Sequence, residues 1–234
     1  MAKLTVQNLC KSYVLQGTKH EVLKNLSFTA DLGKITVLLG KSGCGKTTLL
    51  RLLSHLETAD SGEIVLPSAL KIGMMFQEAR LMPWLTCEEN ITLGLAKDYD
   101  RKHIAELLAT VGLSNFAKAY PSQLSGGMQQ RVALARTLAQ KSEVILMDEP
   151  FAALDYFTRL SMQQEVLRIK AMLGTSIIFV THNIDEALAL ADKILIMQEG
   201  AIAREIVLPE KSERDVLAEP YLSYKKQILE ALQD

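Results

Sequence analysis

The sequence predicts an α/β fold built on a parallel sheet with helices packed against it, and three observations support this. Short apolar runs rich in Val, Ile and Leu alternate with helical patterns, as strands and crossover helices do in parallel sheets. Apolar residues make up 48% of the chain and charged residues 23%, a composition that argues against disorder. The chain has 234 residues, enough for one compact unit to bury a sizeable core.

The strands expected in this fold fall into two groups. Three apolar runs are expected to be buried strands, at residues 35–39, 143–147 and 176–180. Three earlier runs are expected to form strands of the same sheet or of an antiparallel edge, at residues 4–9, 63–66 and 71–76. The N-terminal part of the chain is therefore rich in strands.

Residues 87–140 contain no convincing strand and carry a helical pattern instead. Their apolar side chains recur at i, i+3, i+4 and i+7, at Ile104, Leu107, Leu108 and Val111. We therefore expect a helical lobe inserted between strands of the core.

A second apolar stripe follows the predicted strand at 143–147. It runs through Met162, Val166, Ile169 and Leu173, and it predicts a helix that covers the sheet. Beyond Pro209 the pattern weakens into a charged segment. A short helical tail at residues 221–232 is expected there, either docked on the core or frayed.

Charge, cysteine content and hydropathy narrow the function classes. The chain has 26 Lys and Arg against 27 Asp and Glu, a net charge of −1, and no basic run, so we expect no nucleic-acid partner. Cys10, Cys44 and Cys87 are odd in number and scattered, which favours free thiols in a reducing cytosol. No secretory signal and no apolar run of about 18 residues is found, so another chain would have to span any membrane that this protein serves.

The most specific motif is a glycine-rich loop between a predicted strand and a predicted helix that begins near Thr48. It matches G-x-x-x-x-G-K-[ST], with the residues Gly40, Lys41, Ser42, Gly43, Cys44, Gly45, Lys46 and Thr47. Its glycines let backbone N–H groups and the helix N-terminus face phosphates, and Lys46 adds a charge at the β- and γ-phosphates. Thr47 would ligate Mg²⁺. The alternative is a glycine turn that binds nothing, but the strand-loop-helix context favours an ATP site.

An acidic pair ends the second buried strand. Asp148 and Glu149 follow the apolar run at 144–147, and the ends of parallel strands open onto the ligand crevice. We expect Asp148 to hold Mg²⁺, directly or through water, and Glu149 to orient or deprotonate the water that attacks the γ-phosphate. The alternative for Glu149 is a solvated acid before the turn at Pro150.

Residues 124–131, Leu-Ser-Gly-Gly-Met-Gln-Gln-Arg, identify the family. This stretch resembles the signature of the ABC ATPases, which begins LSGG and continues into a helix rich in Gln and Arg. Ser125 is suited to cap that helix, while Gly126 and Gly127 permit close backbone approach to an anion. In the family this element faces the γ-phosphate of ATP bound to the other subunit, which implies a homodimer that shares two ATP molecules.

The resemblance extends from Tyr13 to about Gly200 and implies a fold and a domain layout. The fold would be a P-loop NTPase (RecA-like) core with a parallel sheet, an N-terminal antiparallel β subdomain and an inserted α-helical subdomain. The layout would be a single ATPase domain over residues 1–234. Its parts would be a nucleotide-binding core at 1–86 and 141–208, a helical subdomain at 87–140 and a short C-terminal tail at 209–234.

Four further positions match functional residues of the family. Tyr13 matches the aromatic that stacks on adenine, or is an ordinary strand-end tyrosine. Gln77 matches the glutamine that touches Mg²⁺ and the attacking water and also contacts the membrane partner. Asp155, in Ala-Leu-Asp at 153–155, matches the loop that meets the opposing subunit, and it also suits the N-cap of the next helix. His182 ends the third buried strand and matches the histidine that bonds the γ-phosphate.

The type of transport is suggested by residues 76–86, which resemble those of nitrate, sulfonate and taurine importer ATPases. Trp84, beside Pro83, suits a groove for a helix of the membrane subunit, or packs between sheet and lobe. The pair Thr158-Arg159 gives weaker support for the same subfamily. We therefore expect the ATPase of an importer for a small anion, with a substrate-binding protein as an indirect partner, at the cytoplasmic face of the inner membrane. Alternatives are thiamine-precursor import, lipid or drug export, or a non-transport ABC ATPase that acts on nucleic acid.

Overall fold

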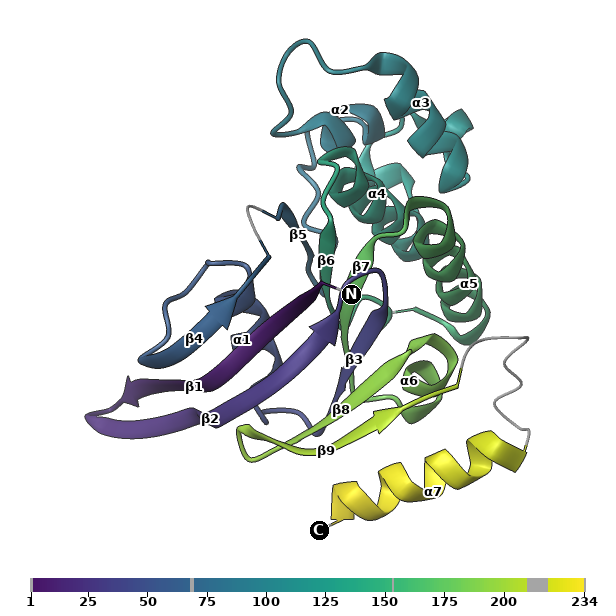
Figure 1. Cartoon of the computed structure of the whole chain (residues 1–234). Helices are drawn as coiled ribbons and strands as arrows, with labels where there is room; N and C mark the ends of the chain where they lie inside the picture. The colour runs from purple at the N-terminus through teal and green to yellow at the C-terminus, as the bar shows by residue number, and fades with distance from the viewer. Residues whose placement is uncertain (1, 68–69, 153, 210–218, 234) are drawn as a thin grey trace.

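The fold is taken from a computed structural model that describes residues 2–67, 70–152, 154–209 and 219–233. In Figure 1 a helical lobe lies at the top, the N-terminal strands extend to the lower left, and the C-terminal helix lies at the bottom right. Two sheets and the lobe account for the architecture.

The central sheet is mainly parallel. Its strand order is β5 (Ile72–Met75), β6 (Val144–Asp148), β7 (Ser176–Thr181), β3 (Ile35–Leu39), β8 (Lys193–Gln198) and β9 (Ala201–Val207). All neighbours pair in parallel except β8 and β9, which form an antiparallel pair at the edge. The C-terminal ends of β3, β6 and β7 therefore lie together at one edge of the sheet.

Side chains along the central strands alternate between two cores, as the two-residue period of a strand requires. In β6, Ile145 and Met147 belong to the core beneath the helical lobe and α5, whereas Val144 and Leu146 belong to the core beneath the N-terminal sheet. The sheet is thus buried on both faces, which explains why its strands are continuously apolar in sequence.

The N-terminal sheet is antiparallel and has the order β2 (Thr18–Asp31), β1 (Lys3–Leu15) and β4 (Ser61–Val65). Strands β1 and β2 form a hairpin whose two turn residues, Gln16 and Gly17, have φ angles of 50° and 78°. Positive φ at both turn positions is typical of the tight turns that match strand twist. Together with α1 (Lys46–Leu53), this sheet covers one face of the central sheet.

The helical lobe contains α2 (Cys87–Thr92), α3 (Arg101–Thr110), α4 (Gly126–Ala139) and 3₁₀ turns at Ser114–Phe116 and Pro121–Gln123. Helix α2 begins with a capping box in which Thr86 and Glu89 satisfy each other's backbone N–H groups. The fully buried Asn90 accepts from the Met82 N–H at 2.7 Å and donates to the Met82, Leu85 and Thr86 carbonyls. One buried amide thus fixes the loop that precedes the lobe.

Three helices complete the other face of the central sheet: α5 (Tyr156–Leu173), α6 (Ile184–Leu190) and α7 (Glu219–Gln233). Helix α7 is docked, because Tyr221, Ile228 and Ala231 are buried and Gln198 Nε2 donates to the Ala231 carbonyl at 2.7 Å. Within the part of the chain that the structure describes, no helix has both the length and the apolar character needed to cross a bilayer.

The fold class predicted from sequence is confirmed, with the 4–9 and 63–66 runs in the antiparallel sheet and the 71–76 run in the central sheet. The prediction that Leu173 belongs to the buried stripe of α5 is wrong: its side chain is 55% exposed, because the helix ends there at Gly174. Strands β2, β8 and β9 and helix α6 were not predicted. The domain boundaries stay a prediction, and α2, α3 and α4 fall within 87–140.

Candidate nucleotide site

The phosphate loop lies between β3 and α1, as its motif predicts. Lys46 is only 5% exposed, and its Nζ donates to the carbonyl oxygens of Gly40 and Lys41 at 2.8 and 2.9 Å. Gly45 caps α1 with a φ of 104°, a conformation that side chains rarely adopt. A Cβ on Gly40 would lie 2.4 Å from the Met197 carbonyl oxygen, so this position accepts glycine only.

The loop forms one wall of a cavity of about 340 Å³. The cavity combines loop glycines, hydroxyls, one lysine and two acids, which suits a polyphosphate with a cation. Its lining residues are Val22, Ser42, Gly43, Gly45, Lys46, Thr47, Thr48, Gln77, Asp148 and Glu149. The cavity thus brings together Gln77, the acidic pair and five of the eight phosphate-loop residues, whereas Gly40, Lys41 and Cys44 do not line it.

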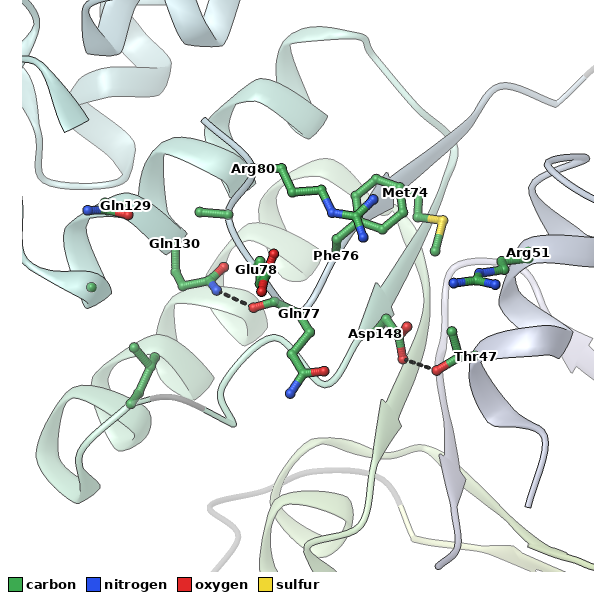
Figure 2. Close-up of a pocket in the computed structure, with 13 residues that line it drawn as sticks. Thr47, Arg51, Met74, Phe76, Gln77, Glu78, Arg80, Gln129, Gln130 and Asp148 are labelled. Carbon is green, nitrogen blue, oxygen red and sulfur yellow. Dashed lines mark hydrogen bonds between the residues drawn. The ribbon is translucent and has the colours of Figure 1, made fainter. Parts of the chain in front are cut away.

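The carboxylate of Asp148 sits at the end of β6, beside the start of α1. Thr47 Oγ1 donates to Asp148 Oδ1 at 3.1 Å (Figure 2). Burial raises the pKa of Asp148 above its ordinary value, the hydrogen bond from Thr47 opposes this rise, and the nearby Glu149 charge adds to it. A buried carboxylate whose charged form is disfavoured gains from a cation beside it.

The donor set around Asp148 fits Mg²⁺. The Thr47 hydroxyl, the Asp148 carboxylate and the side-chain amide oxygen of Gln77 are hard oxygen ligands that face the same cavity. Mg²⁺ is usually bound by one or two carboxylates together with substrate phosphates, and a site with the single carboxylate of Asp148 allows that.

Glu149 connects the phosphate loop to the end of β7. Its Oε2 lies 2.9 Å from His182 Nδ1, and its Oε1 lies 3.9 Å from Lys46 Nζ. Glu149 has a φ of 42°, and its backbone N–H donates to the Val180 carbonyl at 3.1 Å. A non-glycine residue in this conformation costs roughly 1–3 kcal/mol, and such strain is often found at functional sites. The strained residue is thus the one whose carboxylate lies within hydrogen-bond distance of His182.

Gln77 and the start of α4 face each other across a second cavity of about 620 Å³ (Figure 2). Thr47, Asp148 and Gln77 line this cavity together with Gly126, Gln129 and Gln130. Gln130 Nε2 donates to the Gln77 carbonyl at 2.7 Å. The backbone at Gln77 is therefore bound to the signature helix.

The signature begins α4 as expected, and Ser125 Oγ accepts the N–H of Met128 at 3.3 Å. Ser125 and Gly126 are exposed, and a Cβ on Gly126 would meet nothing within 4 Å. A Cβ on Gly127 would lie 2.5 Å from Thr158 Cγ2, so this glycine is required by packing against α5. The side-chain direction is therefore open at Gly126 and blocked at Gly127, and the predicted contact of both glycines with a nucleotide stays a prediction.

Tyr13 lies beside α1. Its hydroxyl donates to Glu57, and Lys11 Nζ lies 5.3 Å from the centre of its ring. Burial, and then the Glu57 carboxylate, raise the pKa of Tyr13, while a hydrogen bond with Thr48 opposes the rise. The structure therefore links Tyr13 to the helix that follows the phosphate loop, and its predicted contact with adenine stays a prediction.

Asp155 caps α5, since its Oδ1 accepts the N–H groups of Phe157 and Thr158, both at 3.1 Å. Asp155 is exposed, so the predicted contact with a second subunit remains open to it. Ala153 of the same motif lies outside the described residues. Trp84 is 70% exposed, so the alternative that it packs in the core is wrong.

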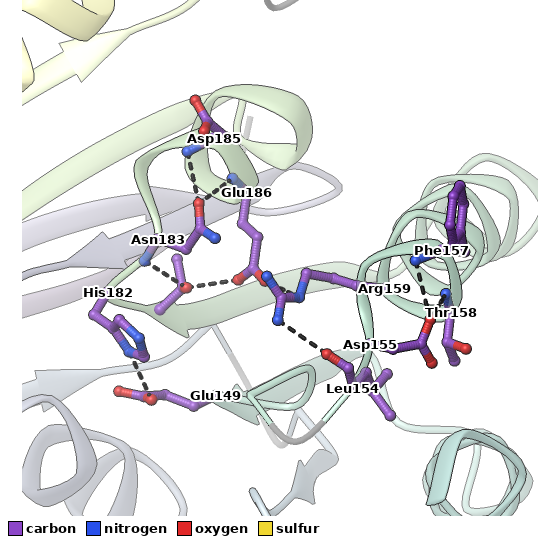
Figure 3. A network of polar contacts seen from close by, with 11 residues as sticks. Glu149, Leu154, Asp155, Phe157, Thr158, Arg159, His182, Asn183, Asp185 and Glu186 are labelled. Atoms are coloured by element: carbon purple, nitrogen blue, oxygen red, sulfur yellow. Dashed lines mark hydrogen bonds and ion pairs between the residues drawn. The ribbon is translucent and has the colours of Figure 1, made fainter. Parts of the chain in front are cut away.

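Two polar residues near the site were not identified from the sequence as functional. The buried Glu186 of α6 and the half-buried Arg159 of α5 form an ion pair next to Glu149 and His182 (Figure 3). Arg159 was noted only as part of a subfamily pair. A glutamate four residues after His182 was the only available signal for Glu186, and without the fold it points to no partner.

A lysine-bearing glycine loop after β3 and an acidic end of β6 beside it define a P-loop nucleoside triphosphatase. Residues 23–152 match the family model described as "ABC transporter". The chain is 47% identical over 195 residues to the aliphatic sulfonates import ATP-binding protein SsuB 1 of Shouchella clausii, covering 82% of this chain and 78% of that protein. It is 41% identical over 234 residues to SsuB 2 of Agrobacterium fabrum, covering 97% and 88%.

A solved structure gives the same result. The dimeric ATP-binding cassette MJ0796, in a post-hydrolysis state bound to ADP and Pi, has a TM-score of 0.78 and 31% identity, covering 89% of this chain and 100% of that chain. The chain belongs to the ABC transporter family, and it is an ATP-binding transport ATPase.

Proposed function

We propose that this chain powers the import of an aliphatic sulfonate by binding and hydrolysing ATP as a homodimer attached to a membrane permease. The observation that carries the ATPase part is the contact series from Lys46 through Glu149 to His182 beside the phosphate loop. The sulfonate cargo is supported by relatives named as aliphatic sulfonates import proteins, such as SsuB 1 and SsuB 2. From the sequence alone, nitrate and taurine were equally possible cargoes.

In the proposed mechanism each side chain has one role. Lys46 exchanges its bonds to the Gly40 and Lys41 carbonyls for phosphate oxygens. Thr47, Asp148 and Gln77 would hold Mg²⁺, which when bound supplies positive charge at the β- and γ-phosphate oxygens. Glu149 orients the attacking water and accepts its proton, and His182 holds the Glu149 carboxylate in place.

The second half of each site comes from a second copy of the chain. Ser125 and Gly126 are exposed at the N-terminus of a 14-residue helix, which favours an anion. The dimeric state named for the MJ0796 structures supports this arrangement. Asp155 would lie at the same junction, and Tyr13 would stack on the adenine.

The permease contact is assigned to the exposed Trp84 and its loop, at the cytoplasmic face of the inner membrane. This loop is held rigidly by Asn90, which suits a docking surface for a short helix. A substrate-binding protein would act on the permease and would not touch this chain. Export of lipids or drugs and action on nucleic acid have no comparable support.

The test has two arms. The purified chain should hydrolyse Mg-ATP, and turnover should stop when Mg²⁺ is chelated. In the native host, deletion of the gene should abolish uptake of a labelled alkanesulfonate and leave uptake of nitrate and of a thiamine precursor unchanged. Unchanged sulfonate uptake with loss of another cargo would overturn the sulfonate assignment and leave the ATPase assignment standing.

A further inference from the structure

An ion pair between the buried Glu186 and the half-buried Arg159 joins the segment around His182 to the turn before α5 (Figure 3). Glu186 is only 6% exposed; its Oε1 lies 3.5 Å from Arg159 Nε, and its Oε2 accepts from Thr181 Oγ1 at 2.6 Å. Arg159 Nη2 donates to the Leu154 carbonyl at 2.9 Å. One guanidinium thus contacts both the residue before Asp155 and the first turn of α6.

The same network fixes the backbone on both sides of His182. Thr181 Oγ1, which donates to Glu186, also accepts the backbone N–H of Asn183 at 3.0 Å. The Asn183 side chain in turn accepts the N–H groups of Asp185 and Glu186. His182 therefore sits in a short loop whose two neighbours are both tied to the ion pair, while its ring contacts Glu149.

A polar cavity of about 50 Å³ separates the ion pair from Glu149 and His182. Its lining residues are Glu149, Ala152, Arg159, Thr181, His182, Asn183 and Glu186. Within the described residues Arg159 Nε makes no hydrogen bond, although it is buried. Burial raises the pKa of Glu186, and Thr181, Arg159 and His182 oppose that rise. A buried donor without a hydrogen bond calls for an explanation, and this one lies at a cavity that Glu149 and His182 also line.

We propose that Arg159 and Glu186 are positioning residues for ATP hydrolysis, which hold the Leu154–Asp155 turn and the His182 loop at a fixed separation. The inference rests on the proposed ATPase mechanism, in which Asp155 meets the second copy and His182 holds Glu149. Contact with the second copy would then set the position of His182 through Leu154, Arg159 and Glu186. Neither Arg159 nor Glu186 lines the cavity of about 340 Å³ beside the phosphate loop.

A purely structural role makes a different prediction. Replacing a buried ion pair by neutral side chains of similar size is often neutral for stability, whereas removing one partner is strongly destabilising. The double variant Arg159→Met/Glu186→Gln therefore removes the link and leaves no uncompensated charge. Arg159→Lys keeps the charge, but one ammonium does not match the forked contact to Leu154 and Glu186.

The experiment compares this double variant, Arg159→Lys and the wild type for kcat, KM, equilibrium ATP affinity and melting temperature. The matched control is Arg168→Met/Glu165→Gln, which removes another Arg–Glu pair, of 2.7 Å, from the same helix, with Arg168 exposed and Glu165 half-buried. We expect kcat to fall about 10- to 100-fold in the double variant and in Arg159→Lys, because small misplacements of catalytic groups have effects of this size. ATP affinity should stay within about twofold, and the control should match the wild type.

A double variant that melts like the wild type and turns over at the wild-type rate would overturn the positioning role. So would a fall in turnover explained wholly by weaker ATP binding or lower melting temperature. A wild type that does not hydrolyse Mg-ATP would instead overturn the proposed function, so the two failures are distinguishable.

Discussion

The phosphate-loop region and the signature region differ in how much of the binding geometry one chain supplies. Around the loop, Lys46 and Asp148 are buried, Glu149 is half-buried, and these groups contact one another or their immediate neighbours. At the signature, Ser125 and Gly126 are exposed at a helix N-terminus. The first region is a preformed concave site, and the second is a surface that acquires a role only when another surface meets it.

The difference follows from the elements that carry each region. The loop connects β3 to α1, and the acids end β6, so both are positioned by a sheet buried on two faces. The signature starts a helix of the lobe, whose buried face packs in the same apolar core as β6 and whose polar side chains bind the loop after β5. Gln130 binds the Gln77 carbonyl, and Arg136 donates to the Ala79 and Arg80 carbonyls at 2.7 and 3.0 Å.

The largest expected effect tests the phosphate-loop region. Glu149→Gln should lower turnover about 10²- to 10⁴-fold, because the amide no longer accepts a proton from the attacking water. ATP affinity should change little, since the amide keeps the shape of the side chain. Steady-state hydrolysis and equilibrium ATP binding measure the two quantities.

The control for this variant is Glu143→Gln, at the opposite end of β6, where the carboxylate accepts the Lys71 N–H at 3.0 Å. Its turnover should equal that of the wild type. If both variants turned over at the wild-type rate, Glu149 would lose its assigned role.

A smaller effect is expected from cutting the link between the two regions. Gln130→Leu removes the donor to the Gln77 carbonyl and should destabilise the fold by about 1 kcal/mol, the usual net value of a hydrogen bond. Turnover should also fall, because the Gln77 backbone would no longer be held by a hydrogen bond from the signature helix. Gln129→Leu loses a bond to Pro121 within the lobe and provides the comparison.

Thermal melting and hydrolysis assays measure both effects. Equal turnover for the Gln130 and Gln129 variants would mean that the hydrogen bond from Gln130 to Gln77 does not contribute to hydrolysis.

The smallest effect concerns the adenine end of the phosphate-loop region. The Tyr13 hydroxyl, and also Arg51, lower the pKa of Glu57, so Glu57 stabilises the fold above its unfolded pKa of about 4.3. That contribution is lost as the pH falls through the lower folded pKa. Tyr13→Phe should therefore lose a few tenths of a kcal/mol to about 1 kcal/mol at pH 7, since surface contacts are screened.

The stability lost in Tyr13→Phe should shrink as the pH falls below the unfolded carboxyl pKa of about 4.3 and through the lower folded pKa of Glu57. Melting curves across pH measure this trend. Phe keeps the aromatic ring, so ATP affinity should stay within about twofold if stacking is the role of Tyr13. A loss of stability that did not vary with pH would show that the hydrogen bond to Glu57 does not cause it.

The sequence predicted best what depends on local pattern and strand ends. The phosphate loop is encoded in eight consecutive residues, and Asp148 and His182 were placed correctly because they end strands of one parallel sheet. Contacts between distant elements could not be predicted. Arg159 and Glu186 are 27 positions apart, and only the packing of α5 against α6 makes them partners. The exposure of Trp84 likewise depends on how Asn90 fixes its loop.

The central claim is that ATP is held between the phosphate loop of one copy and the exposed signature of another. The most direct measurement is light scattering of Glu149→Gln with ATP, alone and combined with Ser125→Arg, with Ser125→Thr as the variant that keeps the helix cap. The account predicts that Glu149→Gln and its Ser125→Thr combination form ATP-dependent dimers, whereas the Ser125→Arg combination binds ATP and stays monomeric. A Ser125→Arg combination that dimerises as tightly as Glu149→Gln alone would contradict the account.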